Sequence, residues 1–151
     1  MQVYNGYSGT SFNNPVITMG VFDGVHLGHR MLLGRVTEEA RATSADAVAV
    51  TFDPHPRIVL TGDPAHLSFL TDIEERIELL RGTGIGHLVI IPFTEELSRL
   101  TASDFVESIL CRHLGVRHLI TGYDHHFESD QCQRQRQCQF HLYGQRSRRQ
   151  R

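Results

Sequence analysis

A glycine-rich segment, residues 20–29, contains two histidines three positions apart and follows a short apolar run. It reads Gly-Val-Phe-Asp-Gly-Val-His-Leu-Gly-His. Glycines let a backbone approach a phosphate group closely, and the free amides at the start of a helix attract an anion. One helical turn would place His26 and His29 on the same side, where both imidazoles could stabilise the negative charge of a phosphoryl-transfer transition state. The segment therefore predicts a phosphate site in which neither histidine is a nucleophile.

A metal site is the alternative that these residue types leave open, because Asp23 stands close to the two histidines. A protein zinc site requires three or four ligands at recognisable spacing. The glycines favour the phosphate interpretation, since a metal site has no need of them. We predict no metal ion held by the protein's own side chains.

The surrounding pattern is that of an α/β protein with a Rossmann-like parallel sheet. Apolar, β-branched runs predict four strands, at residues 16–22, 47–52, 87–92 and 117–122. Helical spacing predicts three helices: residues 27–42, a second opened by a capping box of Thr71 and Glu74, and a third from about Thr101 or Ser103 to Gly115. Alternating strands and helices indicate parallel strands with right-handed crossovers, and ligands bind such sheets at the carboxyl ends of the strands.

One connection, residues 53–70, is long, contains three prolines and has no clear periodicity. Long connections in compact domains are usually functional. It opens with Asp53-Pro54-His55-Pro56, which by itself equally indicates a rigid loop. Because the preceding strand neighbours the one before residues 20–29, we expect both segments at the same edge of the sheet.

Together these motifs resemble the nucleotidyltransferase superfamily, in the form of the prokaryotic FAD synthetases. Gly-x-Phe-Asp-Gly-x-His-x-Gly-His is the signature of that family, and residues 51–56, 70–76 and 118–127 are similar to its later motifs. The resemblance covers about residues 14–127. It implies an FMN adenylyltransferase, which transfers AMP from ATP to FMN with release of pyrophosphate and uses Mg²⁺ together with ATP.

The resemblance also implies roles for individual residues. His26 and His29 would be the catalytic pair that stabilises the α-phosphate as FMN attacks. The residues implied for ATP binding are Gly20, Val21, Phe22, Asp23, Gly24, Gly28 and Asp124. Those implied for flavin binding are Asp53, Pro54, His55, Pro56 and Phe127. For Asp124, a turn-forming role is an equal alternative.

Residues 128–151 depart from the family pattern. Residues 1–130 carry 17 acidic residues and 9 arginines, whereas residues 131–151 carry 6 arginines, 7 glutamines and no acid. The Ser-Ser-Thr-x-x-Arg motif and the riboflavin kinase domain that the resemblance implies are absent. We therefore expect a nucleotide-binding domain over residues 1–127, incomplete at its C-terminal end through a frame change or fusion. We also expect a disordered tail over residues 128–151 and little FAD formation; the alternative is a remnant that only binds nucleotide or flavin.

Bulk properties give no indication of a membrane or nucleic-acid partner. The net charge is −2, and no apolar run approaches the roughly 18 residues of a membrane span. The N-terminus lacks the charged and apolar regions of a signal peptide. We expect a cytoplasmic protein whose partners are the small molecules ATP and FMN.

Overall fold

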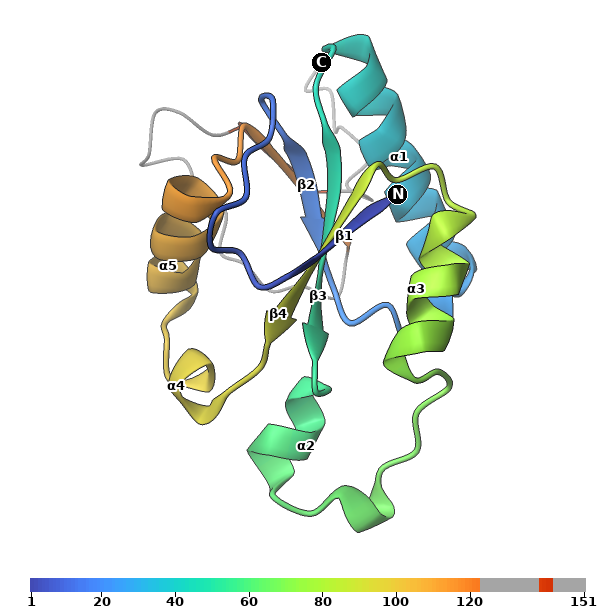
Figure 1. The fold of residues 1–151 in the computed structure, drawn as a ribbon, viewed down its shortest axis with the longest axis vertical. Helices are drawn as coiled ribbons and strands as arrows, with labels where there is room; N and C mark the ends of the chain where they lie inside the picture. Colours follow the sequence, from blue (N-terminus) through green and yellow to red (C-terminus); the bar gives the residue numbers. More distant parts are fainter. Residues whose placement is uncertain (123–138, 143–151) are drawn as a thin grey trace, which may run out of the picture.

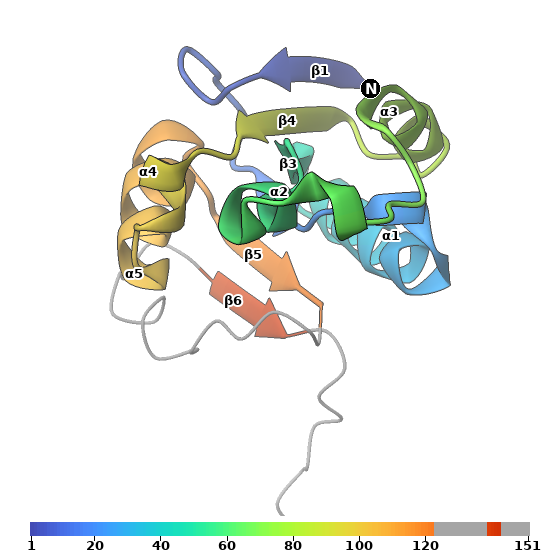
Figure 2. The same ribbon diagram turned by 90° about the horizontal axis from the view of Figure 1, so that it is seen from below.

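The computed structural model describes residues 1–122 and the backbone of residues 139–142. Six parallel strands form one sheet in the order β1-β4-β3-β2-β5-β6 (Figures 1 and 2). The strands are β1 (Gln2–Asn5), β2 (Val16–Met19), β3 (Ala47–Asp53), β4 (His87–Pro92), β5 (His118–Thr121) and β6 (Gln139–Leu142). The predicted Rossmann-like parallel sheet, with β2 and β3 adjacent, is confirmed.

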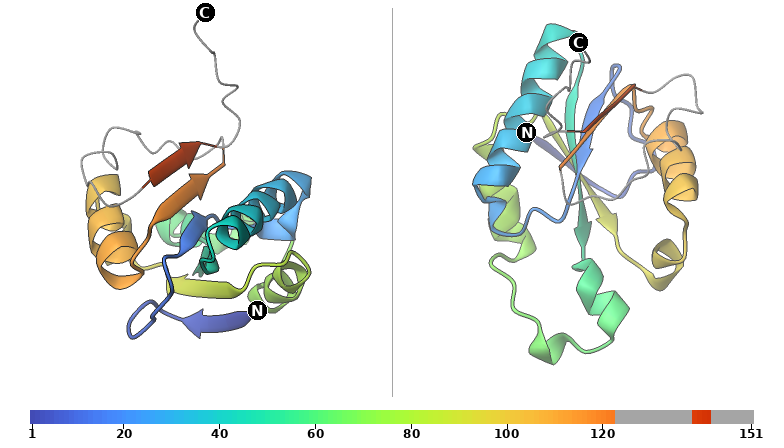
Figure 3. Two further views of the ribbon diagram at one scale, coloured as in Figure 1. Left: turned by 90° about the horizontal axis from the view of Figure 1, so that it is seen from above. Right: turned by 180° about the vertical axis from the view of Figure 1, so that it is seen from behind.

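Helices cover both faces of this sheet. They are η1 (Asp23–Val25), α1 (Leu27–Ala42), α2 (Pro56–Thr61), η2 (Pro64–His66), α3 (Ile73–Arg81), α4 (Glu95–Ser98), α5 (Ala102–Phe105) and η3 (Val106–His113). α1 and α3 lie on one side of the sheet, and α4 and α5 lie on the other (Figures 1 and 3). α2 lies beyond the carboxyl end of β3 (Figure 1).

Burial on both faces explains why the central strands are continuously apolar. Along β3, Val48 and Val50 pack in the cluster that includes Phe105 of α5, whereas Ala47 and Ala49 pack in the cluster that includes Leu33 of α1. Strands of parallel sheets are covered on both sides and read as uninterrupted apolar runs. This two-sided core holds the carboxyl ends of β2, β3 and β4 in fixed relation.

The edges of the sheet contain two strands that the sequence analysis did not predict. β1 pairs with β4, and β6 pairs with β5 through the register His118 to Gln139 and Thr121 to Leu142. The expectation of a disordered tail over residues 128–151 is therefore wrong for residues 139–142. Gln-Phe-His-Leu alternates polar and apolar residues, a strand pattern hidden by the polar composition around it. The other tail residues, with Asp124 and Phe127, lie outside the described residues.

Two helix starts test the capping predictions. Thr101 accepts a hydrogen bond from the Asp104 amide (3.1 Å) and caps α5, so of the two predicted starts, Thr101 and Ser103, the helix uses the first. At α3 the predicted capping box is wrong by one residue. Asp72 accepts from the Glu75 amide (2.8 Å), and the Glu75 carboxylate accepts from the Asp72 amide (3.1 Å). Thr71 is thereby left outside the box.

The third predicted helix is present over Ala102–His113 but is less regular than expected. α4 precedes it, and α5 continues directly into η3, a π-helical stretch in which the Leu114 amide donates to the Ile109 carbonyl (3.0 Å). Gly115, at φ 64°, follows this stretch, as predicted. No helix in the part of the chain that the structure describes combines the length and apolar character that a bilayer crossing requires.

Replacing Asp72 by alanine should destabilise the protein by about 1 kcal/mol, because the replacement removes the side-chain acceptor of the Glu75 amide in the observed capping box at the N-cap of α3. Glu74→Ala is the control, since Glu74 takes no part in that box. Urea unfolding of both variants measures the free energies. A larger loss for Glu74→Ala would contradict the observed register.

Candidate active site

The segment predicted to bind phosphate, residues 20–29, lies at the carboxyl end of β2 and is called the phosphate loop below. The chain proceeds from β2 to β3 and β4 on one side and later reaches β5 on the other side of β2. The strand order therefore reverses at β2, which is where open α/β sheets bind their ligands. η1 and the start of α1 both lie within this loop.

His26 and His29 lie in contact at the first turn of α1. Their rings are stacked with centroids 3.6 Å apart and planes 21° apart. His26 is the N-cap, and its Nδ1 accepts a hydrogen bond from the His29 amide (3.4 Å). An imidazole that accepts at Nδ1 carries its proton on Nε2 when neutral. The sequence-predicted pair is therefore brought together, and His26 has a ring N–H to donate to a ligand.

Two buried residues hold the phosphate loop in its shape. Phe22 and Val25 have positive φ values, 56° and 42°, outside the usual range for such side chains. Conformations of this kind cost roughly 1–3 kcal/mol each. Both side chains are only 1 % exposed in the core beside α1, and complete burial of an apolar side chain contributes about 1.5–3 kcal/mol. Packing in the core therefore offsets the backbone strain.

The glycines of the phosphate loop make room for neighbours within the chain. A Cβ atom on Gly24, whose φ is 71°, would lie 2.7 Å from Leu70 Cδ1. A Cβ atom on Gly28 would lie 3.2 Å from His26 Cε1. The sequence analysis assigned both glycines to close approach of a phosphate. The structure gives each of them an internal steric reason as well.

Asp23 points its carboxylate at the segment that precedes α3. Its oxygens accept hydrogen bonds from the Leu70 amide (2.9 and 3.0 Å), the Thr71 amide (2.8 Å) and the Thr71 hydroxyl (3.0 Å). Burial works to raise the pKa of Asp23, but these hydrogen bonds and the charge of Arg76 together hold the pKa below its ordinary value. The carboxylate thus joins two segments of the chain, while the predicted contact of Asp23 with ATP stays a prediction.

Arg76 is a buried cation beneath this site that the sequence analysis missed. Its side chain is 3 % exposed, and its Nη1 donates to the Phe52 carbonyl (3.1 Å) and the Thr51 hydroxyl (3.4 Å). The Thr51 hydroxyl in turn donates to the Val21 carbonyl (3.0 Å). Burial lowers the pKa of Arg76 while Asp23, Asp53 and Asp72 act to raise it. The sequence offered one signal for this buried cation: Arg76 stands three residues after Ile73, on the apolar side of a predicted helix.

The segment predicted to bind flavin begins where β3 ends. His55 caps α2, and its Nδ1 accepts from the Arg57 amide (3.1 Å). Its ring stacks on Phe69, with centroids 4.4 Å apart. Burial, together with the positive charge of Arg76, lowers the pKa of His55, so the ring is neutral at pH 7. The long connection is thus ordered and contains α2 and η2, two short helices that lacked a visible sequence period.

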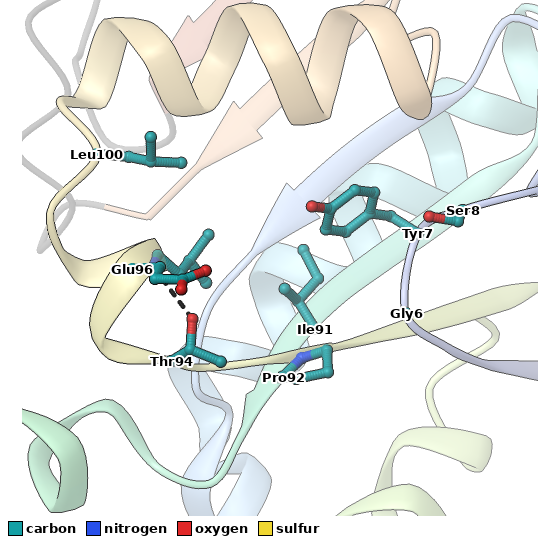
Figure 4. A pocket seen from close by; sticks show the side chains of 9 residues that line it. Gly6, Tyr7, Ser8, Ile91, Pro92, Thr94, Glu96 and Leu100 are labelled. Carbon is teal, nitrogen blue, oxygen red and sulfur yellow. Dashed lines mark hydrogen bonds between the residues drawn. The ribbon is translucent and has the colours of Figure 1, made fainter.

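A cavity of about 490 Å³ opens beside this segment, at the end of β4 (Figure 4). The loop after β1 forms one wall through Tyr7, and Leu100 lies on the other side (Figure 4). Leu97 also lines the cavity. Pro92, which also lines the cavity, is the register partner of Asp53. The cavity therefore adjoins the predicted flavin segment, although none of its lining residues was predicted from the sequence.

The comparison with known proteins decides the family. A sequence model described as FAD synthetase matches residues 9–143. The chain belongs to the FAD synthetase family. This match extends past Phe127, where the resemblance read from the sequence stopped, and the position of the domain boundary stays a prediction.

Relatives of this FAD synthetase family member carry bifunctional names. The chain is 37 % identical over 117 residues to a bifunctional riboflavin kinase/FMN adenylyltransferase of Pseudomonas fluorescens, and 35 % identical over 112 residues to that of Escherichia coli K12. These matches cover 76 % and 74 % of this chain but 36 % of each relative. The chain thus spans about a third of the length of these relatives.

Two further matches cover a larger share of the proteins that they match. A putative bifunctional riboflavin kinase/FMN adenylyltransferase of Geobacillus thermodenitrificans is 30 % identical over 127 residues, covering 84 % of this chain and 68 % of that protein. A solved structure named as a macrolide-efflux protein of Streptococcus pneumoniae has a TM-score of 0.78. It is 24 % identical and covers 94 % of this chain and 51 % of that one, which supports the fold alone.

Acidification should release the Asp23 carboxylate from its partners. Because the folded pKa lies below the ordinary value of about 3.9, the contribution of Asp23 to stability is complete above that value and disappears as the pH falls through the folded pKa. We expect Asp23→Asn to be less stable than the wild type at pH 7, and the difference to shrink below about pH 4.

Denaturant unfolding of both proteins between pH 7 and pH 3 measures this difference. The control is Glu38→Gln, because Glu38 makes only a surface ion pair with Arg35 (3.6 Å). A difference between wild type and Asp23→Asn that stays constant over the whole range would contradict the role given to the carboxylate.

Proposed function

We propose that the chain is an FMN adenylyltransferase that transfers AMP from ATP to FMN and releases pyrophosphate. The observation that carries this proposal is the stacked pair His26 and His29 at the first turn of α1, at the reversal point of a parallel sheet. A helix start offers free amides and positive dipole charge to an anion. Membership of the FAD synthetase family supports the same reaction.

The proposed step is a single displacement at the α-phosphorus of ATP. A phosphate oxygen of FMN attacks and forms the new P–O bond, while the bond to the oxygen that bridges the α- and β-phosphates breaks. The pyrophosphate leaves with that electron pair. The His26 Nε2–H and the ring of His29 would stabilise the α-phosphate oxygens, whose charge rises as the step proceeds, as preorganised donors do.

The phosphate loop would receive the triphosphate through its backbone. The amide of Gly28, in the first turn of α1, has no intrahelical acceptor and is a donor that we assign to ATP, together with the backbone of Val21 and Phe22. The Gly20 amide donates to the Val50 carbonyl (3.0 Å), so Gly20 would line the site without donating to ATP. Mg²⁺ would enter with ATP as its counterion. Within residues 1–122 no group of three or more His, Cys, Asp or Glu side chains could hold a metal ion, and the Asp23 carboxylate is bonded to Leu70 and Thr71.

FMN would bind on the side of β3 and β4. Residues 53–56 leave β3 at the same edge as the phosphate loop, and the cavity lined by Tyr7 and Leu97 adjoins them. A neutral His55 ring, already stacked on Phe69, avoids an additional charge beside an apolar ring system. Asp124 and Phe127 remain proposed contacts of ATP and FMN respectively.

The kinase activity in the relatives' names would belong to the parts of those proteins that this chain does not span. The substrates ATP and FMN are metabolites of the cytoplasm, where we propose that the reaction takes place. Incubating the chain with FMN and MgATP and detecting FAD tests the function directly. Binding of both substrates without FAD would instead support the ligand-binding remnant.

Replacing either His26 or His29 by alanine should lower the rate of FAD formation by roughly 10²–10³, the usual effect of losing one preorganised donor. Binding of ATP, measured by calorimetry, should change much less, because these donors act mainly on the transition state. His66→Ala is the control, since His66 is an exposed residue of η2 that pairs only with Asp63. Undiminished rates in both alanine variants would refute the assigned roles.

A further inference from the structure

The connections that follow β2 and β3 contact each other in space. Asp23 lies in the first connection, and Thr71 lies at the end of the second. The connection after β3 runs outward through α2 and η2 (Figure 1) and returns to the phosphate loop at Leu70. We call residues 54–69 the outer segment. One of its ends is fixed by β3, so its other end depends on what holds Leu70 and Thr71.

The Thr71 hydroxyl makes hydrogen bonds to two residues of the phosphate loop, Gly24 and Asp23. It accepts a hydrogen bond from the Gly24 amide (3.1 Å) and donates one to the Asp23 carboxylate (3.0 Å). The Asp23 carboxylate also accepts from the backbone amides of Leu70 and Thr71. A single side chain therefore satisfies a donor and an acceptor that are 47 and 48 positions away along the chain.

Apolar packing contributes little to this junction. Leu70 contacts Gly24, but its side chain is 75 % exposed. Burial energy scales with the area removed from water, so a side chain this exposed cannot hold the end of the outer segment. The hydrogen bonds of Asp23 and Thr71 hold this end of the outer segment instead.

Helix α3 does not need the Thr71 hydroxyl for its own stability. Its capping box is complete with Asp72 and Glu75. One turn further, Arg76 donates to the Phe52 carbonyl at the end of β3. Arg76 of α3 thus contacts the end of β3, and Thr71, which stands just before the N-cap of α3, contacts the phosphate loop.

We infer that Thr71 is a positioning residue that fixes the outer segment to the phosphate loop, so that FMN and ATP are held at matching positions. This inference rests on the proposed function. Removing the hydroxyl takes away its bonds to Gly24 and Asp23 and loosens the return end of the outer segment, while the backbone amides of Leu70 and Thr71 still donate to Asp23. The capping box and the core stay in place. The effect is therefore local to the site rather than global.

Thr71→Val tests the inference, because valine keeps the shape of threonine and lacks the hydroxyl. Thr71→Ser keeps the hydroxyl and serves as the conservative rescue. Thr43→Val is the matched control, since the Thr43 hydroxyl bonds only to carbonyls at the end of α1 (2.8 Å to Glu39). All four proteins, including the wild type, are compared as full chains.

The first measurement is amide hydrogen exchange by NMR. In Thr71→Val the amides of Gly24, Leu70 and Thr71 should exchange about tenfold faster, equivalent to about 1.4 kcal/mol of local opening. Amides of β3 and β4 should be unchanged, and Thr71→Ser should behave as the wild type does. Unchanged exchange at Gly24 and Leu70, or an equal increase throughout the sheet, would overturn the inference.

The second measurement is titration with FMN and with ATP. In Thr71→Val the affinity for FMN should fall about tenfold, with rescue in Thr71→Ser. Equal FMN affinities in wild type and Thr71→Val would overturn the inference. If the wild type binds neither FMN nor ATP, the proposed function fails, and the exchange pattern alone then decides whether Thr71 fixes the outer segment.

Discussion

The parallel pairing of β2 with β3 is the interaction on which the rest of the structure depends. Met19 is in register with Val50, and the Gly20 amide continues the ladder by donating to the Val50 carbonyl (3.0 Å). Parallel neighbours end at the same edge of a sheet, so two segments distant in the sequence emerge together. Histidines and glycines leave one strand, and an Asp-Pro-His-Pro run leaves the other.

The loops that follow β2 and β3 start at the same edge of the sheet, but this alone does not fix their conformation. Hydrogen bonds and charges around Arg76 fix it. A buried cation is tolerated only where carbonyl, hydroxyl and carboxylate groups compensate for its lost hydration. Arg76 meets the Phe52 carbonyl and the Thr51 hydroxyl, and Asp23 supplies negative charge nearby. Replacing Arg76 would therefore disturb groups of β3 and of the phosphate loop.

Buried, apolar elements could be predicted from the sequence, and elements with weaker patterns could not. β3, β4 and α1 have strong periodic or continuous apolar patterns. β2 and β5 are only four residues each, but they are buried apolar runs. β1 and α2 have no fully buried residue, and β6 stands within a polar stretch of sequence, so their patterns are too weak to read.

The capping box shows a different limit. Thr71 with Glu74 and Asp72 with Glu75 both satisfy the motif, and local sequence cannot choose between them. The choice follows from Asp23, which binds Thr71 from a distant part of the chain. The histidine pair was predictable because its spacing is local, whereas Arg76 was not identified because its partners come from β3.

The internal contacts of Gly24 and Gly28 change what the glycine-rich motif can be used to diagnose. Leu70 occupies the space beside the first, and the His26 ring occupies the space beside the second. Both requirements exist before any substrate arrives. A descendant that had lost its chemistry and kept its fold would still favour both glycines, so finding the motif in a genome reports the shape of a loop rather than turnover.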